Sequence, residues 1–94
     1  MKQFEYDSLC RILKRGFPGK EVFYSRSTHT VGVNLDEHEE AVEGCRFLRD
    51  LDSVLNTTLF WGIENVTPLL LNIRIGIPCL SLDELADIND WETL

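Results

Sequence analysis

Residues 69–77 read LLLNIRIGI and form the clearest strand pattern in the chain. Leucine and isoleucine occupy every second position, and Asn72 and Arg74 fall between them, so the apolar side chains share one face. This alternation predicts a strand that rests on a hydrophobic core with one of its two faces. Pro78 follows at once and is expected to end the strand, because proline cannot donate a ladder hydrogen bond.

Three more segments have strand patterns, all on the N-terminal side of this one. Residues 58–64 alternate in the same way, and a turn at 65–68 is expected to join them to the strand above as a hairpin. Residues 20–26 and 29–35 are rich in valine and aromatic side chains, and a turn around 27–28 predicts a second hairpin.

Two segments before the last strand have the spacing of amphipathic helices. The first covers about Asp7 to Arg15, with Asp7 as its N-cap. The longer one runs from Asp36 to about Leu55 and opens with Asp36 and Glu39 as a capping box. Both are long enough to cover one face of a small sheet.

A third helix is expected after the last strand. Ser81 and Glu84 stand three residues apart and form a capping box at its start. Trp91 is expected to close this helix onto the core. The inward side chains of the helix should be Leu82, Leu85 and Ile88.

The order of these elements defines the expected fold class, which is α+β. Helix, hairpin, helix, hairpin and helix follow one another (αββαββα), which suits a four-stranded, mostly antiparallel sheet with the helices on one face. The 94 residues are enough for one core, so residues 1–94 are expected to form a single globular domain.

Charge is sorted along the chain. Residues 1–34 hold six basic and three acidic side chains, a net charge of +3, whereas residues 35–94 hold three basic and thirteen acidic ones, a net charge of −10. Such a field accelerates the encounter with basic partners. It therefore favours a basic protein as partner and argues against direct binding of nucleic acid.

Two acidic clusters start the second and third predicted helices. Acids near a helix N-terminus complement the helix dipole, which is one explanation for both clusters. The other is a partner-binding face, because carboxylates four residues apart repel each other and the chain tolerates this repulsion twice. The candidate partner-binding residues are Asp36, Glu37, Glu39, Glu40, Glu43, Asp83, Glu84, Asp87 and Asp90. Their use as one site requires that both clusters converge in space.

Two other surfaces are weaker candidates. On the second face of the sheet, Phe23, Phe60 and Leu70 lie among glycines and short polar residues. This face is either an ordinary solvated face or a dimer or partner interface. The first helix has a basic stripe, Arg11, Lys14 and Arg15, which lacks the interleaved aromatic side chains of a nucleic-acid site.

The sequence shows no catalytic, cofactor or metal motif. His29 and His38 fit no zinc-ligand spacing, so no metal site and no cofactor are expected. The three cysteines, Cys10, Cys45 and Cys79, are flanked by apolar residues and are expected to be buried, reduced thiols. Because no catalytic motif is present, the protein is expected not to be an enzyme. No apolar run is long enough for a signal peptide or membrane span, so a cytoplasmic protein with no membrane partner is expected.

These observations favour a small acidic inhibitor. It would bind a basic, nucleic-acid-handling protein and occlude its phosphate-binding surface as a nucleic-acid mimic, either as a phage anti-defence protein of the anti-CRISPR type or as an immunity protein for a nuclease toxin. The alternative is a structural or adaptor domain that homodimerises through its sheet face or an edge strand. The chain could therefore act as a monomer or as a homodimer.

Overall fold

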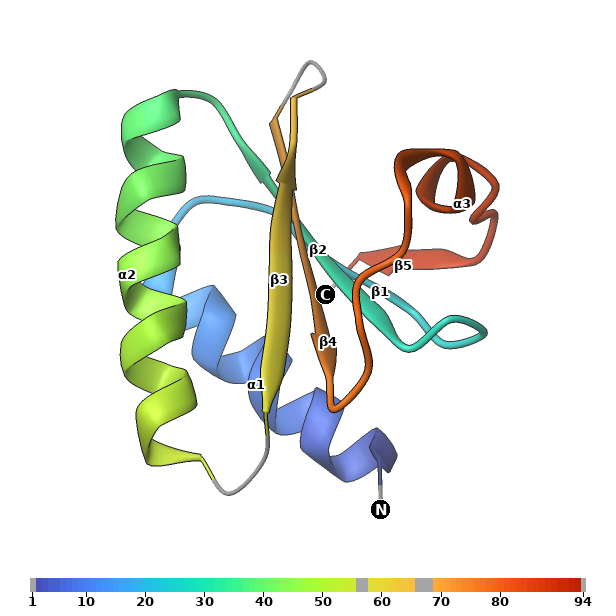
Figure 1. Cartoon of the computed structure of the whole chain (residues 1–94), viewed down its shortest axis with the longest axis horizontal. Helices are drawn as coiled ribbons and strands as arrows, with labels where there is room; N and C mark the ends of the chain where they lie inside the picture. The colour runs from blue at the N-terminus through green and yellow to red at the C-terminus, as the bar shows by residue number, and fades with distance from the viewer. Residues whose placement is uncertain (1, 56–57, 66–68, 94) are drawn as a thin grey trace.

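The computed structural model describes residues 2–55, 58–65 and 69–93, with the predicted turn at 65–68 largely outside them. Three helices and five strands follow one another along this part of the chain (Figure 1). Their bounds are α1 (Lys2–Gly16), β1 (Val22–Ser25), β2 (Thr30–Leu35), α2 (His38–Val54), β3 (Leu59–Glu64), β4 (Leu69–Ile75), α3 (Leu82–Ala86) and β5 (Trp91–Thr93).

The strands form one sheet in the order β3-β4-β2-β1-β5, and every neighbouring pair is antiparallel. Both predicted hairpins are present, and β2 and β4 lie side by side in the middle of the sheet. The prediction of an α+β fold is confirmed. The prediction of four strands was wrong, because β5 adds a fifth strand beside β1.

Helices α1 and α2 cover the inner face of the sheet. α1 contacts β1, and α2 contacts β2, β3 and β4. The core lies between these layers. Its fully buried apolar side chains come from both helices and the three strands β1, β2 and β4: Tyr6, Leu13, Val22, Val31, Val33, Leu35, Leu48, Leu71 and Ile73.

The start of α1 differs from the prediction. The helix begins at Lys2 and not at Asp7, which leaves Asp7 inside the helix. The extra turn carries Tyr6 into the core, where its ring stacks on His29 and lies 5.3 Å from the ring of Tyr24. Its hydroxyl oxygen accepts a hydrogen bond of 2.9 Å from the backbone N–H of Ile75, so α1 is joined directly to β4.

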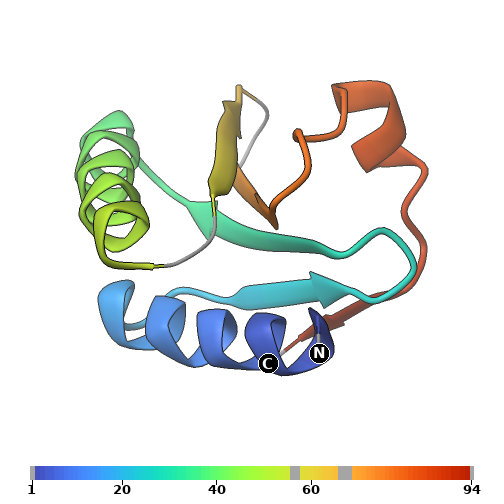
Figure 2. The ribbon, with the colours of Figure 1, turned by 60° about the horizontal axis from the view of Figure 1, so that its bottom comes forward.

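The outer face of the sheet is partly covered by the segment that follows β4. The strand ends at Ile75 and not at Ile77, because Gly76 takes a left-handed φ of 74° and turns the chain back. Arg74 then donates to the carbonyl of Pro78 at 2.8 Å. The chain therefore crosses the outer face before α3 begins, and the prediction that all helices share one face was wrong (Figure 2).

Helix α3 is shorter than predicted, and fewer of its apolar side chains are buried than predicted. Its capping box of Ser81 and Glu84 is confirmed, and Leu85 is buried as predicted. Leu82 is 46% exposed, so its inward position was wrong. Trp91 does not close onto the core, because it lies in β5 on the outer face, with its ring 6.2 Å from that of Phe23.

Candidate functional site

The N-cap of helix α2 is one residue later than predicted. Glu37 is the N-cap, and the Glu40 carboxylate accepts from the backbone N–H groups of Asp36 and Glu37. Asp36 instead pairs with Lys20 at 2.6 Å, and Lys20 also contacts Glu40 at 2.8 Å. The capping box of Asp36 and Glu39 was therefore wrong.

This ion-pair cluster ties the loop after α1 to the start of α2. Hydrogen bonds to Asp36 and then to Glu40 hold the pKa of Lys20 above its ordinary value. In return, the bond from Lys20 holds the pKa of Glu40 below the usual value for a glutamate. Two of the nine predicted partner-binding carboxylates thus have an internal cation, although the Asp36 side chain stays 74% exposed.

The other candidate acids at the start of α2 point outward. Glu37, Glu39 and Glu43 are all exposed. Within the described part of the chain, Glu39 and Glu43 have no ion pair and no side-chain hydrogen bond. We refer to Asp36, Glu37, Glu39 and Glu43 as the α2 acidic ridge. Glu37, Glu39 and Glu43 are exposed and available to a partner, whereas Asp36 is exposed but already paired with Lys20.

The acids around α3 include two that have structural roles. The Glu84 carboxylate accepts from the Ser81 N–H, and this bond lowers its pKa from the ordinary value. Asp90 accepts from the Ser25 hydroxyl at 2.7 Å and from the Ser27 N–H at 2.9 Å, and thereby fixes the C-terminal segment to the β1–β2 turn. Asp83 and Asp87 are exposed.

Replacing Asp90 by alanine is expected to lower the melting temperature at neutral pH. The Ser25 and Ser27 bonds lower the pKa of Asp90 in the folded state. Its stabilisation is therefore present above the unfolded value of about 3.9 and is lost as the pH falls through the lower folded value. Melting curves from neutral to acidic pH should show the difference from wild type shrinking at the acidic end. Asp87→Ala is the control, and an equal effect of both variants would contradict the role of Asp90.

The two acidic clusters do not converge. α2 lies on the inner face of the sheet, whereas the segment that carries α3 crosses the outer face. Figures 1 and 2 show the two helices on opposite sides of the strands. The expectation of one anionic patch from Asp36–Glu43 and Asp83–Asp90 was therefore wrong. The α2 acidic ridge therefore has to serve as a partner surface without the acids around α3.

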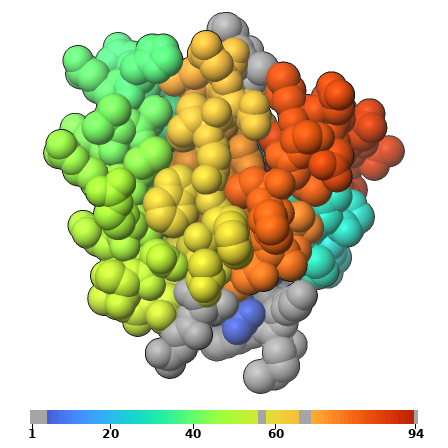
Figure 3. Space-filling model, viewed as in Figure 1, coloured from blue at the N-terminus to red at the C-terminus, as the bar shows by residue number. Residues whose placement is uncertain are grey.

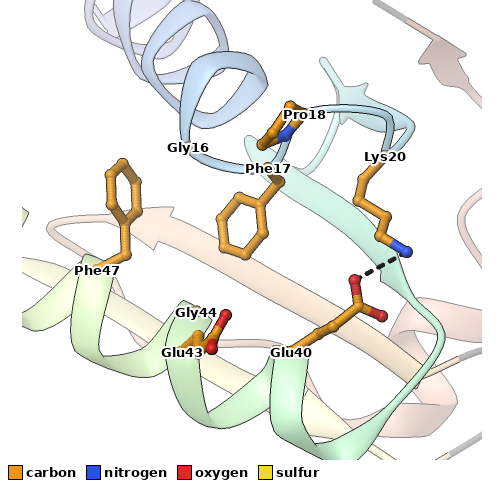
Figure 4. Close-up of a pocket in the computed structure, with 8 residues that line it drawn as sticks. All are labelled: Gly16, Phe17, Pro18, Lys20, Glu40, Glu43, Gly44 and Phe47. Carbon is orange, nitrogen blue, oxygen red and sulfur yellow. Dashed lines mark ion pairs between the residues drawn. The ribbon is translucent and has the colours of Figure 1, made fainter.

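The two flanks of α2 carry opposite charge. On the side of α1, a notch of about 230 Å³ is lined by Phe17, Lys20, Glu40, Glu43 and Phe47 (Figure 4). The ring of Phe17 forms one wall of the notch and packs closely on α2 at Gly44, where an added Cβ would stand 3.0 Å from the ring. The negative charge of Glu43 therefore borders an apolar wall.

On the side of β3, α2 borders a wider groove of about 410 Å³. Its charged rim is basic and its floor is apolar. The lining residues are His38, Ala41, Val42, Cys45, Arg46, Arg49 and Ile63. The helical spacing of the α2 residues in this groove is visible in the sequence. The groove itself could not be predicted, because the position of β3 beside α2 depends on the strand order.

The other candidate surfaces are present but less developed. Phe23, Leu70 and Trp91 line a hollow of about 240 Å³ together with Asn34 on the outer face of the sheet. Phe60 is half-buried on the same face. The basic stripe of α1, which consists of Arg11, Lys14 and Arg15, is exposed.

The thiols differ in their environment. Cys10 is buried, and burial raises the pKa of its thiol to about 11. Cys79 donates to the Asn72 carbonyl, and burial raises its pKa as well. Cys45 and Cys79 are only half-buried, so their predicted burial was incomplete, and Cys45 lines the groove beside β3.

Residues 2–55, 58–65 and 69–93 contain no group of three or more histidine, cysteine or acidic side chains placed to hold a metal ion. In the same part of the chain, no helix has both the length and the apolar content needed to cross a membrane. Compared with known proteins, the chain matches no family model, no curated protein and no solved structure.

Proposed function

We propose that the protein is a non-enzymatic inhibitor that binds a basic, nucleic-acid-handling protein and blocks its phosphate-binding surface. The α2 acidic ridge is the observation that carries this proposal. Its residues Glu39 and Glu43 are presented by a helix that is anchored in the fold by the buried residues Ala41, Gly44 and Leu48. Exposed carboxylates on such a support can occupy arginine and lysine sites that otherwise bind phosphates.

The charge of the ridge supports this assignment. Glu39 and Glu43 stand four residues apart, where like charges destabilise a helix by a few tenths of a kcal/mol. A basic partner relieves that repulsion on binding. The cytoplasm is the proposed location, and the free cysteines of the chain are compatible with its reducing environment. A phage anti-defence protein of the anti-CRISPR type and a toxin-immunity protein would both use this mechanism.

Reversing the charge of Glu39 and Glu43 to lysine is expected to weaken inhibition about tenfold or more, since the contact is electrostatic. The immobilised protein is first used to capture heparin-binding proteins from a cell lysate at low salt. Binding or cleavage of labelled nucleic acid by each captured protein is then measured with added wild type or variant. Inhibition should also fall as salt rises, because the screening length is about 10 Å at 0.1 M.

The matched control is Asp83→Lys with Asp87→Lys. Asp83 and Glu39 both occupy the second position of their helices, and both pairs are four residues apart, so the change in charge is the same. The second residues differ in context, because Asp87 is the C-cap of α3 and Glu43 lies inside α2. The control should inhibit like wild type. Equal inhibition by both double variants, or no inhibition of any captured protein by wild type, would refute the proposal.

A further inference from the structure

Strand β3 is an edge strand with a defined set of outward backbone groups. Among the described residues it pairs only with β4, because it is the first strand in the sheet order. In an antiparallel pair, residues alternate between those that bond to the neighbour and those that direct N–H and C=O away from it. The register therefore decides which groups of β3 are open.

Three hydrogen bonds fix this alternation. The Gly76 N–H donates to the Thr58 carbonyl at 2.7 Å, so this pair is of the bonded kind. One step along, the Ile75 N–H turns away from β3 and donates to Tyr6, and the Leu59 N–H turns outward and donates to Asp52 at 2.8 Å. Continuing the alternation, Trp61 and Ile63 direct their N–H and C=O groups to the open edge.

The open edge lies beside the basic groove of α2. Figure 3 shows β3 in yellow on the surface, between α2 in green and the segment that carries α3 in orange. The apolar part of the groove includes Val42, whose side chain is 56% exposed, and Ile63 from β3 itself. The groove has a volume of about 410 Å³ and is open to solvent.

The rim of the groove has unused positive charge. Arg46 and Arg49 are exposed, and neither makes an ion pair or a side-chain hydrogen bond with a residue in the described ranges. These two arginines and Arg74 are the three basic residues of the segment 35–94, whose net charge is −10. Two unpaired arginines at one groove favour a ligand with anionic groups, and carboxylates are the anionic groups that an unmodified peptide supplies.

We propose that this groove binds an extended, acidic peptide segment of a partner protein, which adds to the sheet as a strand beside β3. Its backbone pairs with Trp61 and Ile63. Alternate side chains point toward α2, where an apolar one enters the groove and a carboxylate reaches Arg46 or Arg49. Backbone pairing supplies affinity in this mode, and the alternate side chains supply specificity.

A second copy of the chain fits the same edge less well. Antiparallel pairing of two β3 strands would relate the copies by a two-fold axis perpendicular to the sheet, so both α2 helices would lie on the same face and next to each other. Each basic rim would then meet the other basic rim. Like charges brought together in this way oppose association.

A displayed library of random peptides, selected on the immobilised protein, tests the proposal. The selected peptides should be enriched in aspartate or glutamate together with valine or isoleucine. Reversing Arg46 and Arg49 to glutamate should weaken binding of the synthesised peptides about tenfold for each arginine lost. The matched control is Arg11→Glu with Arg15→Glu on α1, which should bind like wild type. Selection of no peptide, or equal binding by both double variants, would overturn the proposal.

Hydrogen exchange locates the bound peptide. Binding should slow exchange of the Trp61 and Ile63 amides, and it should leave the Leu59 amide unchanged because Asp52 already accepts its hydrogen bond. A bound peptide should also slow alkylation of Cys45 in the groove. Unchanged exchange at Trp61 and Ile63 would rule out strand addition. Sedimentation that shows dimers with a protected β3 edge would assign this edge to a second copy instead.

Discussion

Replacing Leu48 by alanine is expected to lower the free energy of unfolding by about 2–5 kcal/mol, the usual range for a buried leucine. Leu48 is 0% exposed and belongs to the core between α2 and the sheet. Its removal leaves a cavity under the helix that presents both the acidic ridge and the basic groove. Urea denaturation followed by tryptophan fluorescence measures the change.

The control for this prediction is Val54→Ala on the same helix. Val54 is 76% exposed, so its truncation should change the stability by at most about 0.5 kcal/mol. Similar losses for the two variants would mean that α2 is not held to the sheet by Leu48. Partner binding by Val54→Ala should equal that of wild type.

Replacing Tyr6 by phenylalanine is expected to cost about 1–3 kcal/mol of stability. The substitution keeps the ring that stacks on His29 but removes the oxygen that accepts from the Ile75 N–H. Tyr6 is 1% exposed, so water cannot easily replace that oxygen. The donor is then left unpaired in the core, which is the costly outcome.

Amide exchange gives a direct readout of this variant. The Ile75 amide should lose protection in Tyr6→Phe, while the neighbouring Ile73 amide in the same strand should keep it. A stable variant with a protected Ile75 amide would contradict the role of the tyrosine hydroxyl. Loss of protection along all of β4 would indicate general loosening of the strand and would contradict a local effect.

Much of the fold could be predicted because its elements have strong periodicity. The bounds of α2 were predicted within two residues at the start, and both hairpins follow from alternating side chains. Strand β5 could not be predicted in this way. Three residues, Trp91–Thr93, are too few for a pattern, and they form a strand only because β1 offers a free edge.

The candidate site was predicted less well, for a topological reason. The sequence indicates that Glu39, Glu43, Asp83 and Asp87 are exposed, and they are. It does not indicate which face of the sheet the chain crosses after β4. That choice depends on Gly76 and on the hydrogen bonds of Arg74 to the carbonyls of Pro78 and Thr28. The same dependence on strand order concealed the groove between α2 and β3.

The pairing of β1 with β5 bears on how the chain is made in the cell. Phe23 pairs with Thr93, so the ribosome releases one partner of this ladder long before the other. During synthesis β1 is an unpaired edge strand of the nascent sheet, and unpaired edge strands can pair with neighbouring chains and aggregate. Slow translation or crowded overexpression therefore exposes β1 to aggregation, whereas in the folded protein β5 covers this edge.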